Sequence, residues 1–256
     1  MDDVIERAVM RVIESMQENH GEPLTIDDMA RTAMFSKFHF SRVFQRVTGL
    51  SPGRFLSAVR LREAKRLLAV TSLSITNISH QVGYSSVGTF SSRFTQSVGL
   101  SPSRYRQLMS ITEQDLRDGA ARRPEGRTVT VHGTAVSPMA ERPVFVGMFP
   151  GQILEGRPAS YDLIRRPGPF VLREVPEGRW YLLAQSVAES REDAIHYPPN
   201  GDNALWIGRH GPIAVGSNGA TQRADVRLQP MRSLDPPVLL ALRDLLSTWD
   251  DGEGRG

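Results

Sequence analysis

Two segments of the chain, fifty residues apart, pair a stripe of apolar residues with side chains that can hydrogen-bond or stack. On a helical wheel the first segment buries one face, made of Phe40, Val43, Phe44 and Val47. The opposite face carries side chains able to touch a base edge: Phe38, Ser41, Arg42 and Gln45. An arginine can donate two hydrogen bonds to guanine O6 and N7, and an aromatic ring can pack on a thymine methyl group. These residue types at this spacing indicate base recognition in a major groove.

Two of these residues have a second interpretation. Phe38 could instead pack back onto neighbouring helices, and Arg42 could instead contact a phosphate or form a salt bridge. Polar groups at the start and edge of the same segment are expected to bind phosphates: Ser36, Lys37 and Arg46.

The second segment repeats the stripe but offers a different outward face. Its apolar positions follow the same spacing: Phe90, Phe94 and Val98. Three uncharged residues are its candidate base contacts: Gly88, Thr89 and Ser92. The polar residues expected to bind phosphates are Ser86, Arg93 and Gln96. Small hydroxyl side chains discriminate weakly between bases, so the first segment should specify the sequence and the second should mainly hold the backbone.

Helix-terminating residues frame both segments. Gly49 and Gly99 suit the left-handed position after a helix end, and each is followed by Leu-Ser-Pro. Serine suits the N-cap and proline the first turn of the next helix. Apolar periodicity predicts helices over residues 2–18, 25–31, 37–47, 52–70, 74–81, 87–97 and 102–109. The chain therefore carries a doubled helix-turn-helix, with Ser36, Ser51 and Ser101 expected as N-caps.

The predicted helix 52–70 connects the two motifs. At ~1.5 Å per residue it is about 28 Å long, and successive major-groove faces recur at about 34 Å on one side of a duplex. One chain can thus present two helices to successive grooves and read a non-palindromic site.

Charge is distributed unevenly along a chain whose net charge is only +3. Residues 31–110 hold twelve basic residues and a single acid, Glu63, whereas residues 1–30 hold two arginines and eight acids. A basic stretch is often only a solvated surface. Its coincidence with the doubled motif favours a surface that faces phosphates.

The motifs together resemble the AraC/XylS family of bacterial transcription regulators over about residues 5–108. The matching pieces include Phe40-Ser41-Arg42-Val43-Phe44, Gly49-Leu50-Ser51-Pro52, Arg60-Leu61 with Ala64, and Gly99-Leu100-Ser101-Pro102. The resemblance implies that Phe38, Ser41 and Arg42 read bases. Two features depart from the family pattern: Ser92 stands where an arginine is common, and the DNA-binding unit precedes the other domain.

The second half of the chain changes period from 3.6 to 2. A polar linker at 111–127 separates the double helix-turn-helix domain at 1–110 from a domain at 128–235. Strands are predicted over 128–131, 144–148, 160–165, 169–175, 179–187, 204–208 and 224–228. Short strands between Pro- and Gly-rich turns indicate an antiparallel β-sandwich, so the fold class is multidomain α and β. Val129, Val131 and Gly133, followed by the motif at 170–184, resemble carboxypeptidase regulatory-like, transthyretin-like sandwiches, which are mostly accessory modules.

Two features of this half suggest partners. Six aromatic residues line an effector pocket or simply fill the sandwich: Phe149, Tyr161, Phe170, Trp180, Tyr181 and Trp206. The segment 236–256 is expected to hold a terminal helix at 237–249, which docks on the sandwich or pairs with a second chain as a homodimer.

Several function classes lack their residues. The chain has no cysteine, which excludes disulfides and thiolate chemistry. His132, His196 and His210 are scattered without metal-ligand spacing, and no nucleophile or phosphate-cradling motif occurs. We therefore expect no enzyme activity, no metal and no cofactor. No apolar run approaches membrane-spanning length, so a cytoplasmic protein without a membrane partner is expected.

The sequence as a whole favours a sequence-specific transcription regulator that binds double-stranded DNA and recruits or blocks RNA polymerase. In this reading the sandwich senses an effector, dimerises or contacts a protein. Two other interpretations stay open: a low-specificity architectural DNA binder, and a ligand-binding module with DNA binding as its readout.

Overall fold

The computed structural model describes residues 2–108, 128–186, 205–216 and 222–241. The chain divides into two compact units. The helical unit takes in Met1–Met109 together with Arg232–Leu239, and the β unit takes in Ser110–Met231 together with Leu240–Gly256.

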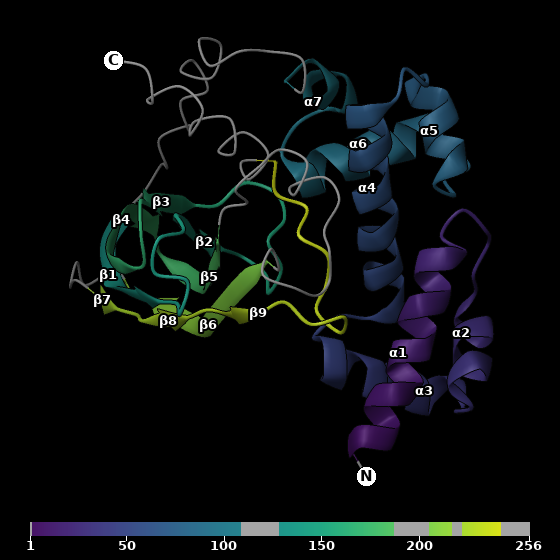
Figure 1. The fold of residues 1–256 in the computed structure, drawn as a ribbon, viewed down its shortest axis with the longest axis horizontal. Helices are drawn as coiled ribbons and strands as arrows, with labels where there is room; N and C mark the ends of the chain where they lie inside the picture. The colour runs from purple at the N-terminus through teal and green to yellow at the C-terminus, as the bar shows by residue number, and fades with distance from the viewer. Residues whose placement is uncertain (1, 109–127, 187–204, 217–221, 242–256) are drawn as a thin grey trace. The chain divides into compact units, whose positions relative to one another are not determined.

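The helical unit contains two similar halves joined by a long helix. Its helices are α1 (Asp2–Glu18), α2 (Ile26–Ala33), α3 (Lys37–Thr48), α4 (Pro52–Val70), α5 (Ile75–Gln81), α6 (Val87–Val98) and α7 (Pro102–Leu108). We call α1–α3 the first head and α5–α7 the second head. In Figure 1, α4 runs between the two heads. The pairs α2–α3 and α5–α6 form the two predicted helix-turn-helix motifs.

Each head is built around the same aromatic contact. Phe44 of α3 meets Phe55 of α4 edge to face, with 5.4 Å between ring centroids. Phe94 of α6 meets Tyr105 of α7 in the same way at 5.7 Å. All four rings are buried, and each such pair contributes ~0.5–1.5 kcal/mol beyond the area it buries. The aromatic stripes predicted from the sequence are therefore the cores of the two heads; Val47, at the edge of its stripe, is only half-buried.

The helix ends follow the predicted residues closely. Gly49 and Gly99 take φ values of 79° and 90° at the C-caps of α3 and α6. The second motif helix of the first head starts where expected, but α2 runs two residues beyond the predicted end at Arg31. Ala33 is buried and continues the helix, and Met34 then takes the left-handed conformation that ends it.

The expected serine caps are only partly present. Ser36 and Ser51 occupy the N-cap positions of α3 and α4, but neither side chain makes a capping hydrogen bond. These two helix starts are held by the backbone, since the amides of Phe40 and Phe55 donate to the Ser36 and Ser51 carbonyl oxygens at 2.8 and 3.0 Å. Ser101 does cap, because its hydroxyl accepts from the Arg104 amide at 3.3 Å.

The β unit consists of two sheets. The first has the order β4 (Gly168–Pro176), β1 (Thr128–Val136), β7 (Gln222–Arg223), with β8 (Val226–Arg227) also paired to β1. The second has the order β3 (Ser160–Ile164), β2 (Val144–Phe149), β5 (Gly178–Ser186), β6 (Trp206–Val215), β9 (Gln229–Pro230). The pairs are antiparallel except that β7 and β8 run parallel to β1, which differs from the all-antiparallel expectation.

One core lies between the two sheets. Val131 and Leu172 of the first sheet and Val146 and Leu182 of the second belong to the same buried cluster. This shared core confirms the predicted sandwich. Gly133 marks a close approach within it, because a Cβ there would lie 1.8 Å from the Ala224 carbonyl oxygen.

Two predicted strands differ from the structure. The strand expected at 204–208 is β6, which continues to Val215 through Gly211 and Pro212. A proline inside a strand argues against pairing unless a bulge accommodates it, and the β5–β6 register does shift between Trp180 and Leu182, opposite this point. Of the strand expected at 224–228, only residues 226–227 pair, as β8, while β7 ends at Arg223, before the predicted start.

The expected terminal helix does not start at residue 237. Residues 236–240 have no helical hydrogen bonds, and the Leu240 amide donates to the Leu154 carbonyl oxygen at 3.1 Å instead. Pro237 alone does not account for the difference, because proline is tolerated in the first turn of a helix; the Leu240 amide is instead engaged by Leu154. The rest of the predicted helix, 242–249, and the predicted linker at 111–127 lie outside the described residues.

Candidate nucleic-acid interface

The outward face of α3 is exposed at three of the four positions predicted to touch bases, whereas Ser41 is half-buried. Phe38 is 84% exposed, and Arg42 and Gln45 are exposed as well. Phe40 and Phe44, on the opposite face, are fully buried. The alternative in which Phe38 packs back onto the helices is therefore wrong.

The polar groups of this face are open to an incoming molecule. Arg42 forms neither a hydrogen bond nor an ion pair with any residue of the described ranges, so the salt-bridge alternative does not hold there. The Ser41 hydroxyl donates to the Lys37 carbonyl oxygen at 2.9 Å, and its own oxygen can still accept. Contact with a base and contact with a phosphate stay open for Arg42.

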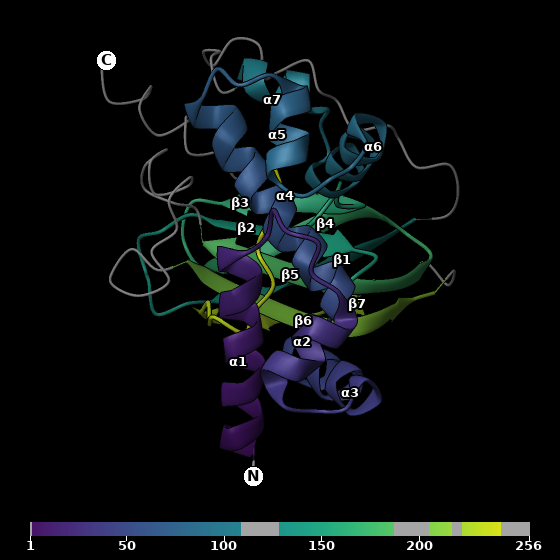
Figure 2. The same cartoon turned by 90° about the vertical axis from the view of Figure 1, so that its right-hand side faces the viewer.

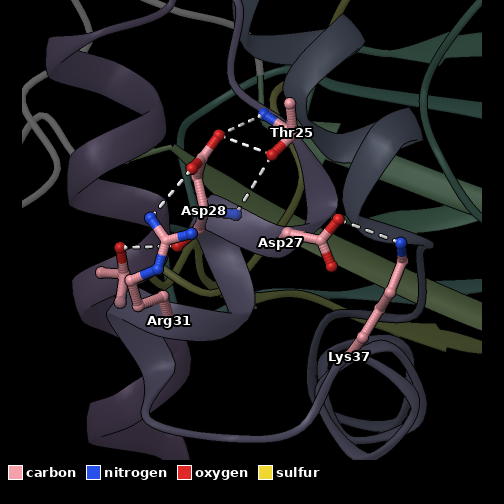
Figure 3. Close-up of polar contacts among 6 residues, drawn as sticks. Thr25, Asp27, Asp28, Arg31 and Lys37 are labelled. Carbon is pink, nitrogen blue, oxygen red and sulfur yellow. Dashed lines mark hydrogen bonds and ion pairs between the residues drawn. The ribbon is translucent and has the colours of Figure 1, made fainter.

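Lys37 has a partner that the sequence did not reveal. Its Nζ lies 3.1 Å from Oδ2 of Asp27 at the start of α2 (Figure 3). Both side chains are about half exposed, and ion pairs of this kind contribute only ~0–1 kcal/mol. A phosphate can therefore replace Asp27 at little cost. The sequence offers no spacing signal for this pair, because the two residues are ten positions apart on different helices.

Next to this pair, Thr25 and Asp28 close the capping box that starts α2. The Asp28 amide donates to the Thr25 hydroxyl at 3.2 Å, and the Thr25 amide donates to Asp28 Oδ2 at 3.0 Å (Figure 3). Hydrogen bonds from the Thr25 hydroxyl and amide, with Arg31 nearby, lower the pKa of Asp28 below its ordinary value. The capping box anchors the helix that supports α3.

The remaining predicted contacts of the first head lie at the two ends of α3. Ser36 precedes its first turn and Arg46 lies in its last turn, and both are exposed. Together with Lys37 they flank the exposed face of α3. This arrangement suits groups that bind the backbone on either side of a groove.

The outward face of α6 is exposed but uncharged. Gly88, Thr89 and Ser92 are all open to solvent. A Cβ at Gly88 would meet only the Ser86 Oγ, at an ordinary 3.7 Å, so nothing in the chain requires glycine there. The Ser86 hydroxyl already accepts from the Thr89 amide at 3.4 Å, which makes it a helix cap first.

Arg93 and Gln96 are the exposed polar residues beside that face. Figure 2 shows α3 and α6 on the same side of the helical unit, to the right of α1. The helical unit thus presents one face with a cation at its centre and a second face with hydroxyls.

The turns before these two helices differ. Met34 and Gly83 both have positive φ, 58° and 82°. Met34 is 80% exposed, whereas a Cβ at Gly83 would lie 2.7 Å from the His20 carbonyl oxygen and 2.8 Å from Arg60 Nη2. The turn before α6 is therefore crowded at Gly83, whereas the turn before α3 is open to solvent at Met34.

Nothing within the described ranges forms another site of reactive groups. No group of three or more His, Asp or Glu residues placed to hold a metal occurs there. His132 and His210 are exposed on strands, and His196 lies outside the described residues. None of the helices that the structure describes is both long and apolar enough to cross a membrane.

The six aromatic residues of the β unit separate into two groups. Phe170, Trp180 and Trp206 belong to or pack against the core between the sheets, as the filling alternative predicted. The other three lie in the second sheet outside that cluster: Phe149, Tyr161 and Tyr181. The six residues therefore do not form one pocket.

The chain resembles known proteins through its helical part. A family model described as a helix-turn-helix domain matches residues 29–108. The lactose operon transcription activator of Staphylococcus xylosus is 30% identical over 112 residues, which are 44% of this chain and 40% of that protein. The transcriptional activator AarP of Providencia stuartii is 30% identical over 98 residues, 38% of this chain and 73% of that protein.

Among solved structures, an AraC-type transcriptional regulator of Chromobacterium violaceum is similar at 30% identity and a TM-score of 0.40, covering 41% of this chain and 94% of that one. The chain spans less than half the length of the Staphylococcus activator. The match to AarP, by contrast, covers most of that protein. The chain belongs to the AraC/XylS family of transcription regulators.

Proposed function

We propose that this protein is a sequence-specific transcription regulator that places α3 and α6 in successive major grooves of double-stranded DNA. One observation carries the proposal. Phe38, Arg42 and Gln45 form an exposed face on a helix whose other face is buried, and the side chains of Arg42 and Gln45 make no hydrogen bond within the described part of the chain. Side chains held outward on a rigid helix suit base recognition.

The two heads divide the work. The base-reading set comprises Phe38, Ser41, Arg42 and Gln45 on α3, and Gly88, Thr89 and Ser92 on α6. The phosphate-binding set comprises Ser36, Lys37, Arg46, Ser86, Arg93 and Gln96. Because the α6 set has no charge and only small side chains, α3 supplies most of the discrimination and α6 fixes the register on the duplex.

Regulation follows from occupancy of the site. The bound protein recruits RNA polymerase or blocks it, and it acts in the cytoplasm where the duplex is. The β unit has its own core and carries the second role, which is sensing an effector, pairing with a second copy or contacting another protein.

The test is selection of binding sites from random duplexes by the full-length protein, followed by salt-titrated binding to the winner and to a scrambled duplex. We expect one asymmetric motif that spans two grooves and a large preference for it at physiological salt. A motif confined to one groove would mean that only α3 reads sequence. Failure to enrich any motif would contradict the proposal.

The uncharged face of α6 supports a second candidate, an architectural DNA binder of low specificity. Such a protein would gain its affinity from the backbone and show little preference among sequences once salt is raised to the physiological range. The same titration separates the two candidates, because only the specific regulator keeps a large ratio between the selected and scrambled duplexes.

A further inference from the structure

Arg60, in the middle of α4, contacts the loop of the first head. Its Nε donates to the His20 carbonyl oxygen at 2.8 Å, and its Nη2 donates to the Glu22 carbonyl oxygen at 2.8 Å. Both carbonyls belong to the segment that joins α1 to α2. Two donors of one planar guanidinium thus hold the loop between α1 and α2, which contains none of the residues predicted to contact DNA.

The same guanidinium also contacts the turn of the second head. Its central carbon lies 6.0 Å from the centroid of the Tyr84 ring, and the Tyr84 hydroxyl is 3.3 Å from Ser57 Oγ, one turn earlier on α4. Gly83 completes the turn, and a Cβ there would lie 2.8 Å from Arg60 Nη2. The turn between α5 and α6 is therefore fitted around Arg60.

The two heads also touch directly beside this residue. A Cβ at Gly21 would lie 2.7 Å from the Gln81 carbonyl oxygen, so the loop after α1 lies against the end of α5. Arg60 is half-buried at this contact, and burial lowers the pKa of its guanidinium while Tyr84 acts in the opposite direction. The heads are thus linked through a polar junction as well as through α4 itself.

We propose that Arg60 is a positioning residue that sets the orientation of α6 relative to α3, and so selects which two groove positions one chain can occupy. The contact set favours arginine, because Nε and Nη2 donate from two separate atoms of one planar group, whereas a lysine presents all its donors from one compact ammonium that packs less well on a ring. The part of this inference that concerns DNA rests on the proposed function. The part that concerns the orientation of the heads does not.

The orientation is measured without DNA, in the full chain. The absence of native cysteine allows two spin labels at exposed positions, through Glu14→Cys on α1 and Asn77→Cys on α5. We expect one narrow distance distribution for the labelled parent and a broad or shifted one after Arg60→Met. The control is Arg66→Met on the same helix, which breaks only the pair of Arg66 with Glu63 and should leave the distribution narrow.

A second substitution keeps the test decisive if Arg60→Met fails to fold. Arg60→Lys retains charge and most of the volume, and we expect it to broaden the distribution too. Helix content and the melting temperature of each variant are measured alongside. Distributions for Arg60→Met and Arg60→Lys that match the parent would overturn the inference.

Binding to DNA then tests the consequence. For each variant the affinity for a duplex covering both grooves is divided by the affinity for a shorter duplex covering the α3 groove alone. The parent gains affinity from the longer duplex, and we expect that gain to fall ~10-fold in Arg60→Met, because the second head is no longer held at a high effective concentration. Simple destabilisation lowers both affinities equally and leaves their ratio unchanged.

The affinity ratios of the parent and of Arg60→Met distinguish failure of the proposed function from failure of the role of Arg60. If the parent gains nothing from the longer duplex, the two-groove function is wrong whatever Arg60 does. If the parent gains and Arg60→Met gains equally, the function stands and the role of Arg60 is wrong.

Discussion

Arg42 and Lys37 lie on the same short helix in different surroundings. Arg42 is exposed, and its side-chain donors meet no acceptor in the described part of the chain, whereas Lys37 already faces Asp27 at 3.1 Å. A guanidinium can discriminate guanine through two hydrogen bonds, while an ammonium acts as a point charge. The same helix thus carries one residue suited to recognising a base, Arg42, and one suited to binding a phosphate, Lys37.

Arg42→Ala should weaken binding to the selected site by about 1–3 kcal/mol and relax the preference at one base pair. Binding to random duplexes should change little, because a base contact contributes only at its own sequence. Competition binding at fixed salt measures both. Arg46→Ala serves as the control that weakens binding to all sequences alike. Equal losses for Arg42→Ala on both duplexes would assign Arg42 to a phosphate.

Asp27→Asn should raise the affinity for every duplex, because it removes a nearby negative charge and frees the Lys37 ammonium for a phosphate. The affinity is measured over a series of salt concentrations, and the gain should shrink as salt rises. Asp3→Asn is the matched control, since Asp3 pairs with Arg7 at the start of α1, outside the interface. The assignment of Lys37 fails if both substitutions have the same effect.

Asp28→Asn should lower the stability of the helical unit at pH 7. The difference in stability between the parent and the variant should shrink as the pH falls. The folded pKa of Asp28 is lowered by Thr25, so the ionised carboxylate stabilises the fold above its unfolded pKa of about 3.9, and that contribution disappears as the pH falls through the folded value. Urea unfolding followed by helix ellipticity at several pH values measures the difference. A difference that stays constant down to pH 2 would be incompatible with this origin.

At the scale of the elements, the two turns make opposite demands on their left-handed residue. Met34→Gly relieves a conformation that costs a side-chain-bearing residue ~1–2 kcal/mol but adds ~0.5–1 kcal/mol of unfolded-chain entropy, so the net gain in stability should be about 1 kcal/mol or less. Gly83→Ala meets a carbonyl oxygen and Arg60 at under 3 Å and should lose at least ~2 kcal/mol. Denaturant unfolding followed by helix ellipticity measures the free energy of unfolding of both variants. Equal changes for Met34→Gly and Gly83→Ala would contradict the difference in crowding between the two turns.

The elements also show what the sequence could predict. Helices α1 and α4 have the predicted bounds because apolar residues recur at helical spacing along their whole length, and Pro52 suits the first turn of α4. The later part of β6 was missed, since Pro212 argues against a strand and the bulge that admits it depends on β5. The helix start at 237 was predicted from leucine spacing, which does not contain the contact of the Leu240 amide with the Leu154 carbonyl oxygen.

The interface was predictable in the same uneven way. Exposure of Phe38 and Arg42 follows from a wheel, because one helix face must be buried. The partner of Lys37 and the contacts of Arg60 could not be found by spacing, because they join residues ten and about forty positions apart. Contacts between elements need the tertiary arrangement that local patterns do not contain.

At the scale of the whole molecule, the doubled motif places two reading helices on a single chain. Hydroxyl-radical protection of the selected duplex should show two patches on one side, about 10 base pairs apart, with one chain bound per site. Ser92→Glu puts a negative charge on the exposed face of α6 and should remove the second patch while keeping the first. Two chains on a symmetric site would contradict the arrangement.

The paired aromatic contacts, Phe44 with Phe55 and Phe94 with Tyr105, have a consequence for how such a protein changes over generations. Most of the stability resides in the inward faces of the two heads, whereas Arg42 and Ser92 lie outward, where substitutions usually change stability little. Mutations on the outward faces therefore escape the selection that preserves folding. One head can drift toward new target sequences while the other keeps the protein on DNA, so a regulator built this way acquires new promoters by small steps rather than by losing the old ones first.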